Sequence, residues 1–241
     1  MKIVYSYREA DLQKIKELGF DTVVGSFSSM EMDEMVQLGL KCIYHGLVEH
    51  PAICGYYLFD EPDVGKITIE QQEVEIERAR KFSSLPLFIA CIEEVEQQCS
   101  RNFDYYMMDI YYSNKMSKFK NFLNAAMSSL FIQILYKGKK VMPIIGLYDD
   151  NGDFTFAGDD QLKFNAFFRA MFKGDDCAAF MWAGDKVSCS GIVDRLVYQS
   201  QARYVNTFKN RTHWFRPLLY PVAWLFLKIN PLLGKYKITI P

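Results

Sequence analysis

HPAICGYYLFDEPD, residues 50–63, carries the strongest structural signal in this chain of 241 residues. An apolar and aromatic run of strand type, from Ala52 to Phe59, stops abruptly on Asp60 and Glu61. Pro62 cannot donate a hydrogen bond to a sheet, so the strand must end there. Because an unpaired buried carboxylate loses its hydration, we expect the two acids to be solvated, paired or used at the end of this strand.

Strand-like segments occur along most of the chain. Several, such as Val141 to Ile145, are apolar on both faces, as a parallel sheet covered by helices requires. The expected strands are Lys2 to Tyr7, Asp21 to Ser28, Lys41 to Gly46, Ala52 to Asp60, Leu85 to Ile92, Phe103 to Tyr112, Lys140 to Tyr148 and Cys177 to Ala183.

Helix-like segments alternate with these strands, and Gly19 and Gly39 end the first two of them. The expected helices are Glu9 to Leu18, Met30 to Leu38, Ile69 to Phe82, Glu93 to Cys99, Lys115 to Tyr136, Asp160 to Lys173 and about Gly191 to Lys209. This alternation with eight strands predicts an α/β fold, a (β/α)8 TIM barrel, over residues 1–212. The competing architecture is an open doubly wound sheet, which usually carries a glycine-rich first turn; residues 5–8, YSYR, are not such a turn.

The net charge and the cysteine positions limit the classes of function that this chain can have. A formal net charge of -1 argues against nucleic acid as a partner, which prefers a basic face. The six cysteines are scattered, with no CxxC pair and no metal-type spacing, and four fall in or beside expected core strands. We expect reduced cysteines and a cytoplasmic protein. The first residues read as a strand rather than as a secretory signal, which agrees with that location.

The tail from His213 to Pro241 differs from the rest of the chain. It is apolar, aromatic, broken by prolines, and contains basic residues such as Lys228 and Lys235. This composition suits a segment that lies peripherally on a membrane, here the inner membrane face, and it equally suits a segment that packs over the barrel or forms a subunit contact. The tail has no uninterrupted apolar stretch of transmembrane length.

In a barrel, the ends of all the strands converge on one face, where active sites are built. The residues expected there combine acids with aromatic rings, and this combination suits carbohydrate, because sugar C–H faces stack on aromatics while sugar hydroxyls bond carboxylates. The expected set is Tyr7, Ser26, Ser28, His45, Asp60, Glu61, Glu93, Asp109, Tyr111, Tyr112, Tyr148, Asp149, Asp150, Trp182 and Asp185.

Three segments carry a family resemblance. Residues 50–63 resemble the fourth-strand motif of glycoside-hydrolase-type (β/α)8 barrels, His-Pro-x-x-x-Gly-(Tyr/Trp)-x-x-x-Asp-Glu-Pro. YYMMDIYY, residues 105–112, resembles the Asp-x-Tyr-Pro sixth strand of that group, with Tyr112 in the place of proline. LKFNAFFRAMFKG followed by CAAFMWAGD resembles its closing helix and eighth strand. The resemblance spans about residues 1–210 and implies an O-glycosyl hydrolase acting on polysaccharide or lipid-linked glycan.

The resemblance also implies roles for single residues. Glu61 corresponds to the acid/base glutamate that ends the fourth strand, with Asp60 where the family has asparagine. The family's nucleophile is a glutamate at the end of the seventh strand, where this chain has Gly146 to Asp149. Asp149 or Asp150 could substitute for it, or Asp109 could be the second carboxylate or the assistant of a nucleophile that the substrate supplies. Neighbouring carboxylates are expected to raise the pKa of Glu61, as an acid catalyst requires.

The aromatic and histidine candidates are assigned to substrate binding. Tyr148 and Trp182 are expected to be sugar platforms, with Tyr7 and Tyr111 beside them, and His45 to line the wall of the site. We expect no cofactor and no metal: DDNGD, residues 149–153, lacks the closing glutamate of a calcium loop.

Two rival functions remain open at this point. The missing seventh-strand glutamate favours a non-catalytic glycan-binding or assembly protein of a polysaccharide biosynthesis system on the same fold. A lyase or metal-dependent hydrolase would use Asp60, Glu61, Asp109 and His45 as ligands, although few histidines lie near strand ends.

Overall fold

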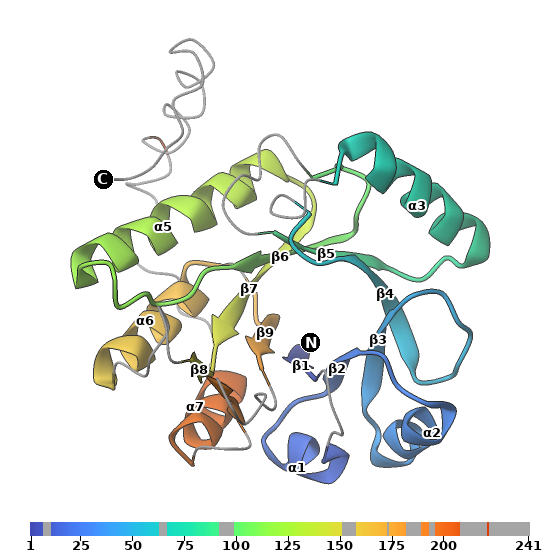
Figure 1. The fold of residues 1–241 in the computed structure, drawn as a ribbon, viewed down its shortest axis with the longest axis horizontal. Helices are drawn as coiled ribbons and strands as arrows, with labels where there is room; N and C mark the ends of the chain where they lie inside the picture. The colour runs from blue at the N-terminus through green and yellow to red at the C-terminus, as the bar shows by residue number, and fades with distance from the viewer. Residues whose placement is uncertain are drawn as a thin grey trace.

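A computed structural model of the chain describes residues 1–6, 11–62, 67–91, 99–150, 158–172, 174–181, 189–192, 196–207 and residue 221. Eight parallel strands form a closed barrel in the order β1-β2-β3-β4-β5-β6-β7-β9, and β9 pairs with β1 to complete the ring. The helices lie outside the strands (Figure 1). This closed ring confirms the predicted (β/α)8 barrel and excludes the open doubly wound sheet.

The barrel strands are short, and each begins and ends within a few residues of its expected bounds. They are β1 (Lys2–Tyr5), β2 (Thr22–Gly25), β3 (Lys41–His45), β4 (Ile53–Phe59), β5 (Leu87–Cys91), β6 (Tyr105–Asp109), β7 (Lys140–Gly146) and β9 (Cys177–Phe180). The sequence did not predict the small antiparallel sheet of β8 (Asp149–Asp150) and β10 (Cys189–Ser190).

The described helices have local signals at their ends. They are α1 (Leu12–Glu17), α2 (Ser29–Leu38), α3 (Ile69–Phe82), α5 (Lys118–Leu135), α6 (Asp159–Ala170) and α7 (Leu196–Thr207). Ser28 and Glu31 form a capping box at the start of α2, and Gly39 ends this helix with φ +66°. Most of the expected helix from Glu93 to Cys99, residues 93–98, lies outside the described residues; Cys99 itself is described and is not helical.

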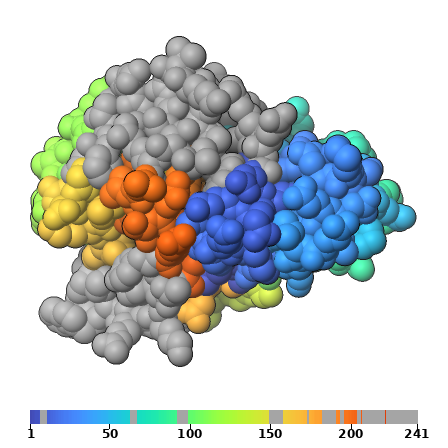
Figure 2. Space-filling model, turned by 90° about the horizontal axis from the view of Figure 1, so that it is seen from below, coloured from blue at the N-terminus to red at the C-terminus, as the bar shows by residue number. Residues whose placement is uncertain are grey.

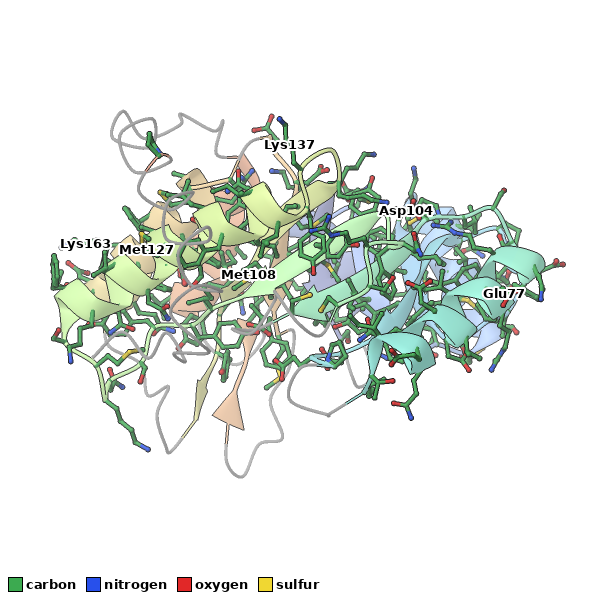
Figure 3. The ribbon with its side chains drawn as sticks, turned by 90° about the horizontal axis from the view of Figure 1, so that it is seen from above. Glu77, Asp104, Met108, Met127, Lys137 and Lys163 are labelled. Carbon is green, nitrogen blue, oxygen red and sulfur yellow. The ribbon has the colours of Figure 1, made fainter. Side chains whose placement is uncertain are left out.

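Two apolar cores flank the sheet. The inner core fills the barrel with side chains such as Tyr5, Tyr57 and Met107. The outer core lies between the sheet and the helices; Met108 on β6 and Met127 on α5 belong to it (Figure 3). The alternation of inward and outward residues along each strand therefore decides which side chains can reach the mouth of the barrel.

Because all eight strands are parallel, their C-terminal ends share one face, called here the mouth, and their N-terminal ends share the opposite face, called the base. At the base, the last turn of α7 meets the end of α1, where the Asn206 amide donates to the Leu18 carbonyl at 3.1 Å. Figure 2 shows α7 beside the N-terminal residues. The tail from residue 213 lies outside the described residues apart from residue 221, and none of the described helices is long and apolar enough to cross a bilayer.

Candidate functional site at the mouth of the barrel

The end of β4 places two acids at the mouth. The register between β4 and β5 shifts between Tyr57 and Phe59, and the Glu61 amide donates to the Ala90 carbonyl of β5 at 3.2 Å. Asp60 is exposed and Glu61 is half-buried. Glu61 has φ +46°, a left-handed conformation that is uncommon for residues other than glycine and that recurs at active sites.

The third acid comes from the last residue of β6. Asp109 follows the inward-facing Tyr105 and Met107 at a spacing of two, and its side chain is 7% exposed. Its carboxyl lies near the Glu61 carboxyl and Tyr111, and both neighbours affect its pKa. The Oδ1 atom of Asp109 has no hydrogen-bond partner among the described residues. The structure therefore brings Glu61 and Asp109 together across β5.

Burial raises the pKa of Asp109 well above its usual range. The contact with Tyr111 opposes this shift, and the nearby carboxyls of Glu61 and Asp60 add to it. Burial disfavours the charged carboxylate, and like charges disfavour joint ionisation. Asp109 consequently keeps its proton to higher pH than an isolated carboxyl would, and the neighbouring Glu61 contributes to this shift.

Asp60 is held by a tyrosine from inside the barrel. The Tyr57 hydroxyl donates to Asp60 Oδ1 at 2.5 Å, and the Tyr5 hydroxyl donates to Tyr57 at 3.3 Å. Burial, then the nearby Tyr5 and Asp60, raise the pKa of Tyr57 well above its usual range, so this hydroxyl keeps its proton as a donor. The ring of His45 stacks on Tyr57 with centroids 4.7 Å apart.

His45 occupies the predicted position at the end of β3, where it is half-buried. Burial lowers its pKa, and the negative charge of Asp60 opposes that shift. The neutral imidazole is thus favoured near neutral pH.

An aromatic cluster adjoins the acids. The Tyr111 and Tyr148 rings meet edge to face at 5.1 Å, and Phe180 stacks on Tyr111 at 5.8 Å. Tyr148 also meets Phe180 edge to face at 5.1 Å. Tyr112 points the other way, since it is buried in the outer core against Phe164 of α6. Among the two tyrosines that follow β6, only Tyr111 therefore adjoins the acids.

The inward positions at the end of β7 carry no carboxylate. They are Gly146 and Tyr148, which continue the every-second-residue series of Met142 and Ile144, whose side chains face the barrel interior. A Cβ atom on Gly146 would lie 2.8 Å from the Tyr111 ring, so this ring occupies the space a side chain would need. Asp149 instead belongs to the small sheet, where its backbone pairs with Ser190. The side chain of Asp149 lies outside the described set, as do Tyr7 and Trp182.

Sequence reasoning placed Ser28 at the mouth as a candidate, but its hydroxyl caps α2 by accepting from the Glu31 amide. Sequence reasoning named Asp109 as a candidate second carboxylate beside Glu61, but it did not predict that the two interact directly, because no spacing pattern links residues on separate strands. Within the described part of the chain, no group of three or more His, Cys, Asp or Glu side chains has the arrangement of a metal site.

A pocket of about 370 Å³ lies at the base, far from these acids along the strands. It is lined by Tyr56 of β4 and by residues that precede β4 or β5, namely Glu49, His50, Pro51, Ser83 and Leu85. His50 Nδ1 accepts from the Ala52 amide at 3.2 Å, and its Nε2 atom lies 3.3 Å from Asp33 Oδ1. His50 thus shapes the turn before β4.

Because the acids and the inward aromatic rings converge at the mouth, the candidate site lies there.

We expect Asp109→Asn to be more stable than the unmodified protein at pH 7, by about 1 kcal/mol or roughly 2–4 °C in Tm. The folded state holds the Asp109 proton to higher pH than the unfolded state, so stability falls as pH rises from the unfolded pKa towards the raised folded pKa. Asparagine cannot ionise, so the gain should shrink towards pH 4. Thermal melts from pH 4 to 8 measure it.

Glu34→Gln is the matched control, since Glu34 is exposed on α2. We expect a shift of less than about 0.5 kcal/mol for this control. A lower Tm for Asp109→Asn at pH 7, with no change in its pH dependence, would contradict the coupling of Asp109 to Glu61.

The chain has the fold of a class of (β/α)8 barrels that contains glycoside hydrolases. Its structural neighbours include a β-glucuronidase of Bifidobacterium dentium, with 12% identity and a TM-score of 0.67 over 87% of this chain and 47% of that one. A β-galactosidase of Marinomonas ef1 matches with 10% identity and a TM-score of 0.63 over 98% of this chain and 60% of that one. A GH113 β-mannanase of Alicyclobacillus acidocaldarius matches with 10% identity and a TM-score of 0.55, over 85% and 96%.

At these identities the likeness establishes the fold alone. The chain spans about half the length of the β-glucuronidases it matches. No protein-family model matches its sequence, and no curated protein matches it either.

Proposed function

We propose that this protein cleaves or remodels a glycosidic bond, with Glu61 as general acid/base. The observation that carries the proposal is the contact between the Glu61 and Asp109 carboxyls at the mouth of the barrel. Glycoside cleavage needs one carboxyl that keeps a proton near neutral pH, and a coupled pair of carboxyls supplies it. The glycoside hydrolases among the structural neighbours support carbohydrate as the substrate class.

The environments of the two carboxyls support different roles for them. A nucleophile has to be ionised, whereas burial and the neighbouring Glu61 carboxyl favour the protonated form of Asp109. In this proposal Asp109 therefore shares a proton with Glu61 and is not the nucleophile. Glu61, which is more exposed, donates the proton to the leaving oxygen.

The second carboxylate of the reaction is assigned to Asp60 or Asp149. Asp60 is exposed at the mouth and fixed by the Tyr57 hydroxyl, so it can stabilise positive charge that develops on the sugar ring. Asp149 follows β7 in the chain, beside the family's usual nucleophile position. In this proposal, five side chains form the wall that binds the sugar: Tyr7, His45, Tyr111, Tyr148 and Trp182.

A panel of aryl glycosides and oligosaccharides, including hexosides and uronides, tests the proposal. We expect release of a reducing sugar from at least one member of the panel. Proton NMR of the first-formed anomer then reports retention or inversion. Binding of a glycan without release of any sugar would overturn the catalytic proposal.

The second candidate function is glycan binding without catalysis. The observation in its favour is the end of β7, where Gly146 and Tyr148 occupy the inward positions. In that case Tyr148→Ala should weaken glycan binding by about 1–2 kcal/mol, or roughly 5- to 30-fold in Kd, while Glu61→Gln leaves Kd nearly unchanged. Isothermal titration with the panel glycans separates the two functions.

A further inference from the structure

Two thiols lie next to each other at the end of β5. Cys91 is the last residue of this strand, and Cys99 is the first described residue after positions 92–98. Their Sγ atoms are 3.1 Å apart, about 1 Å more than the length of a disulfide bond. Cys91 is 0% exposed and Cys99 is 5% exposed. A movement of about one ångström would bring the two sulfur atoms to bonding distance.

The fold itself holds both residues in place. Cys91 is paired in the sheet with Met108 of β6. The Cys99 carbonyl accepts from the Tyr136 hydroxyl at 3.2 Å, and the next residue, Ser100, donates its amide to the Gln72 side chain at 2.9 Å. Separate elements of the fold thus hold the backbone at each of the two cysteines in place.

We propose that Cys91 and Cys99 form a reversible disulfide, with a peroxide as the oxidant. The Cys99 sulfur, which is the more exposed of the two, attacks one oxygen of hydrogen peroxide. The O–O bond breaks and the departing hydroxide takes the Cys99 proton, giving a Cys99 sulfenic acid and water. The Cys91 sulfur then attacks the Cys99 sulfur, the S–O bond breaks, and a second water leaves with the Cys91 proton. Two thiols lose two electrons in total, and one peroxide gains them.

This disulfide would lie beside the candidate site. Ala90, the residue before Cys91, accepts the backbone hydrogen bond of Glu61. A bond from Cys91 to Cys99 closes a short covalent loop and ties the end of β5 to the segment anchored on α3 and α5. Such a cross-link restricts the unfolded chain, so oxidation should raise Tm by about 5 °C.

The test uses the full chain treated with a small excess of hydrogen peroxide, then alkylated, digested with trypsin and analysed by mass spectrometry. Residues 82–101 form one tryptic peptide that contains only these two cysteines. We expect this peptide to lose the mass of two hydrogens and to resist alkylation. Dithiothreitol should restore two alkylatable thiols and the lower Tm.

Cys99→Ser should abolish both the mass loss and the rise in Tm, whereas Cys42→Ser should leave both intact. The peptide map of the unmodified protein gives the answer even if a variant fails to fold. Recovery of the peptide with both cysteines alkylated, oxidised separately to sulfinic acid, or bonded to another cysteine would overturn the proposal. None of these readouts depends on glycosidase activity.

Discussion

Replacing Glu61 by glutamine is expected to lower the rate of glycoside cleavage by about 10²- to 10⁴-fold. Glutamine has nearly the same shape as the acid but carries no proton that it can deliver to the leaving oxygen. The Asp109 carboxyl should remain buried beside the amide. The loss of activity would therefore come from the missing proton of Glu61 and not from a change in packing. The measurement is kcat/KM on the best substrate of the panel, with circular dichroism to confirm that the variant is folded.

Two further variants sharpen this result. Glu34→Gln removes an exposed carboxylate from α2 and should leave kcat/KM unchanged. Glu61→Gly should be as inactive as Glu61→Gln but more stable by about 1 kcal/mol, because glycine adopts a φ of +46° without strain. Full activity in Glu61→Gln would remove the acid/base assignment, and lower stability in Glu61→Gly would remove the argument from backbone strain.

Gly55→Ala is expected to destabilise the barrel by about 3 kcal/mol, or roughly 6–10 °C in Tm. A Cβ atom at Gly55 would clash with Phe88 Cε2 and would lie 2.9 Å from the Pro86 carbonyl oxygen. The Phe88 ring cannot move aside cheaply, since it stacks on Tyr105 with centroids 4.3 Å apart inside the barrel. Thermal or urea unfolding measures the loss.

Gly138→Ala provides the comparison for this variant. Gly138 has φ +91°, and among the described residues no atom lies within 4 Å of the position that a Cβ would take. Alanine there therefore meets backbone strain alone, worth about 1–2 kcal/mol. A loss in Gly55→Ala no larger than that in Gly138→Ala would show that the interior of the barrel yields more easily than its packing indicates.

The fold could be predicted largely because the parallel strands of this barrel have a recognisable sequence pattern. Strands buried on both faces, such as Val141 to Ile145, are continuous apolar runs in the sequence. Helices α2, α3 and α5 begin at a Ser or Thr cap, and Gly39 ends α2. The ends of the strands were less predictable, because sheet pairing rather than sequence decides where a strand stops. The sheet of β8 and β10 left no signal, since strands of two residues have no periodicity to detect.

The candidate site was predictable only in outline. Placing Glu61 and Asp109 at the ends of β4 and β6 follows from the strand assignments, but their direct contact depends on the width of the barrel and on the register shift in β4. The choice of Tyr111 over Tyr112 depends on the inward register of Asp109. The Cys91–Cys99 pair was missed because a search for CxxC spacing overlooks cysteines eight residues apart.

The position of Met1 has a practical consequence for capturing glycans on a solid support. Its ammonium group pairs with Asp176 and its carbonyl accepts from the Cys177 amide, both at the base. A linker attached at residue 1 would thus anchor the molecule with its acids directed towards the bulk solution, where a polymeric chain has free access. The ion pair given up is partly exposed, so this oriented attachment should cost less than about 1 kcal/mol.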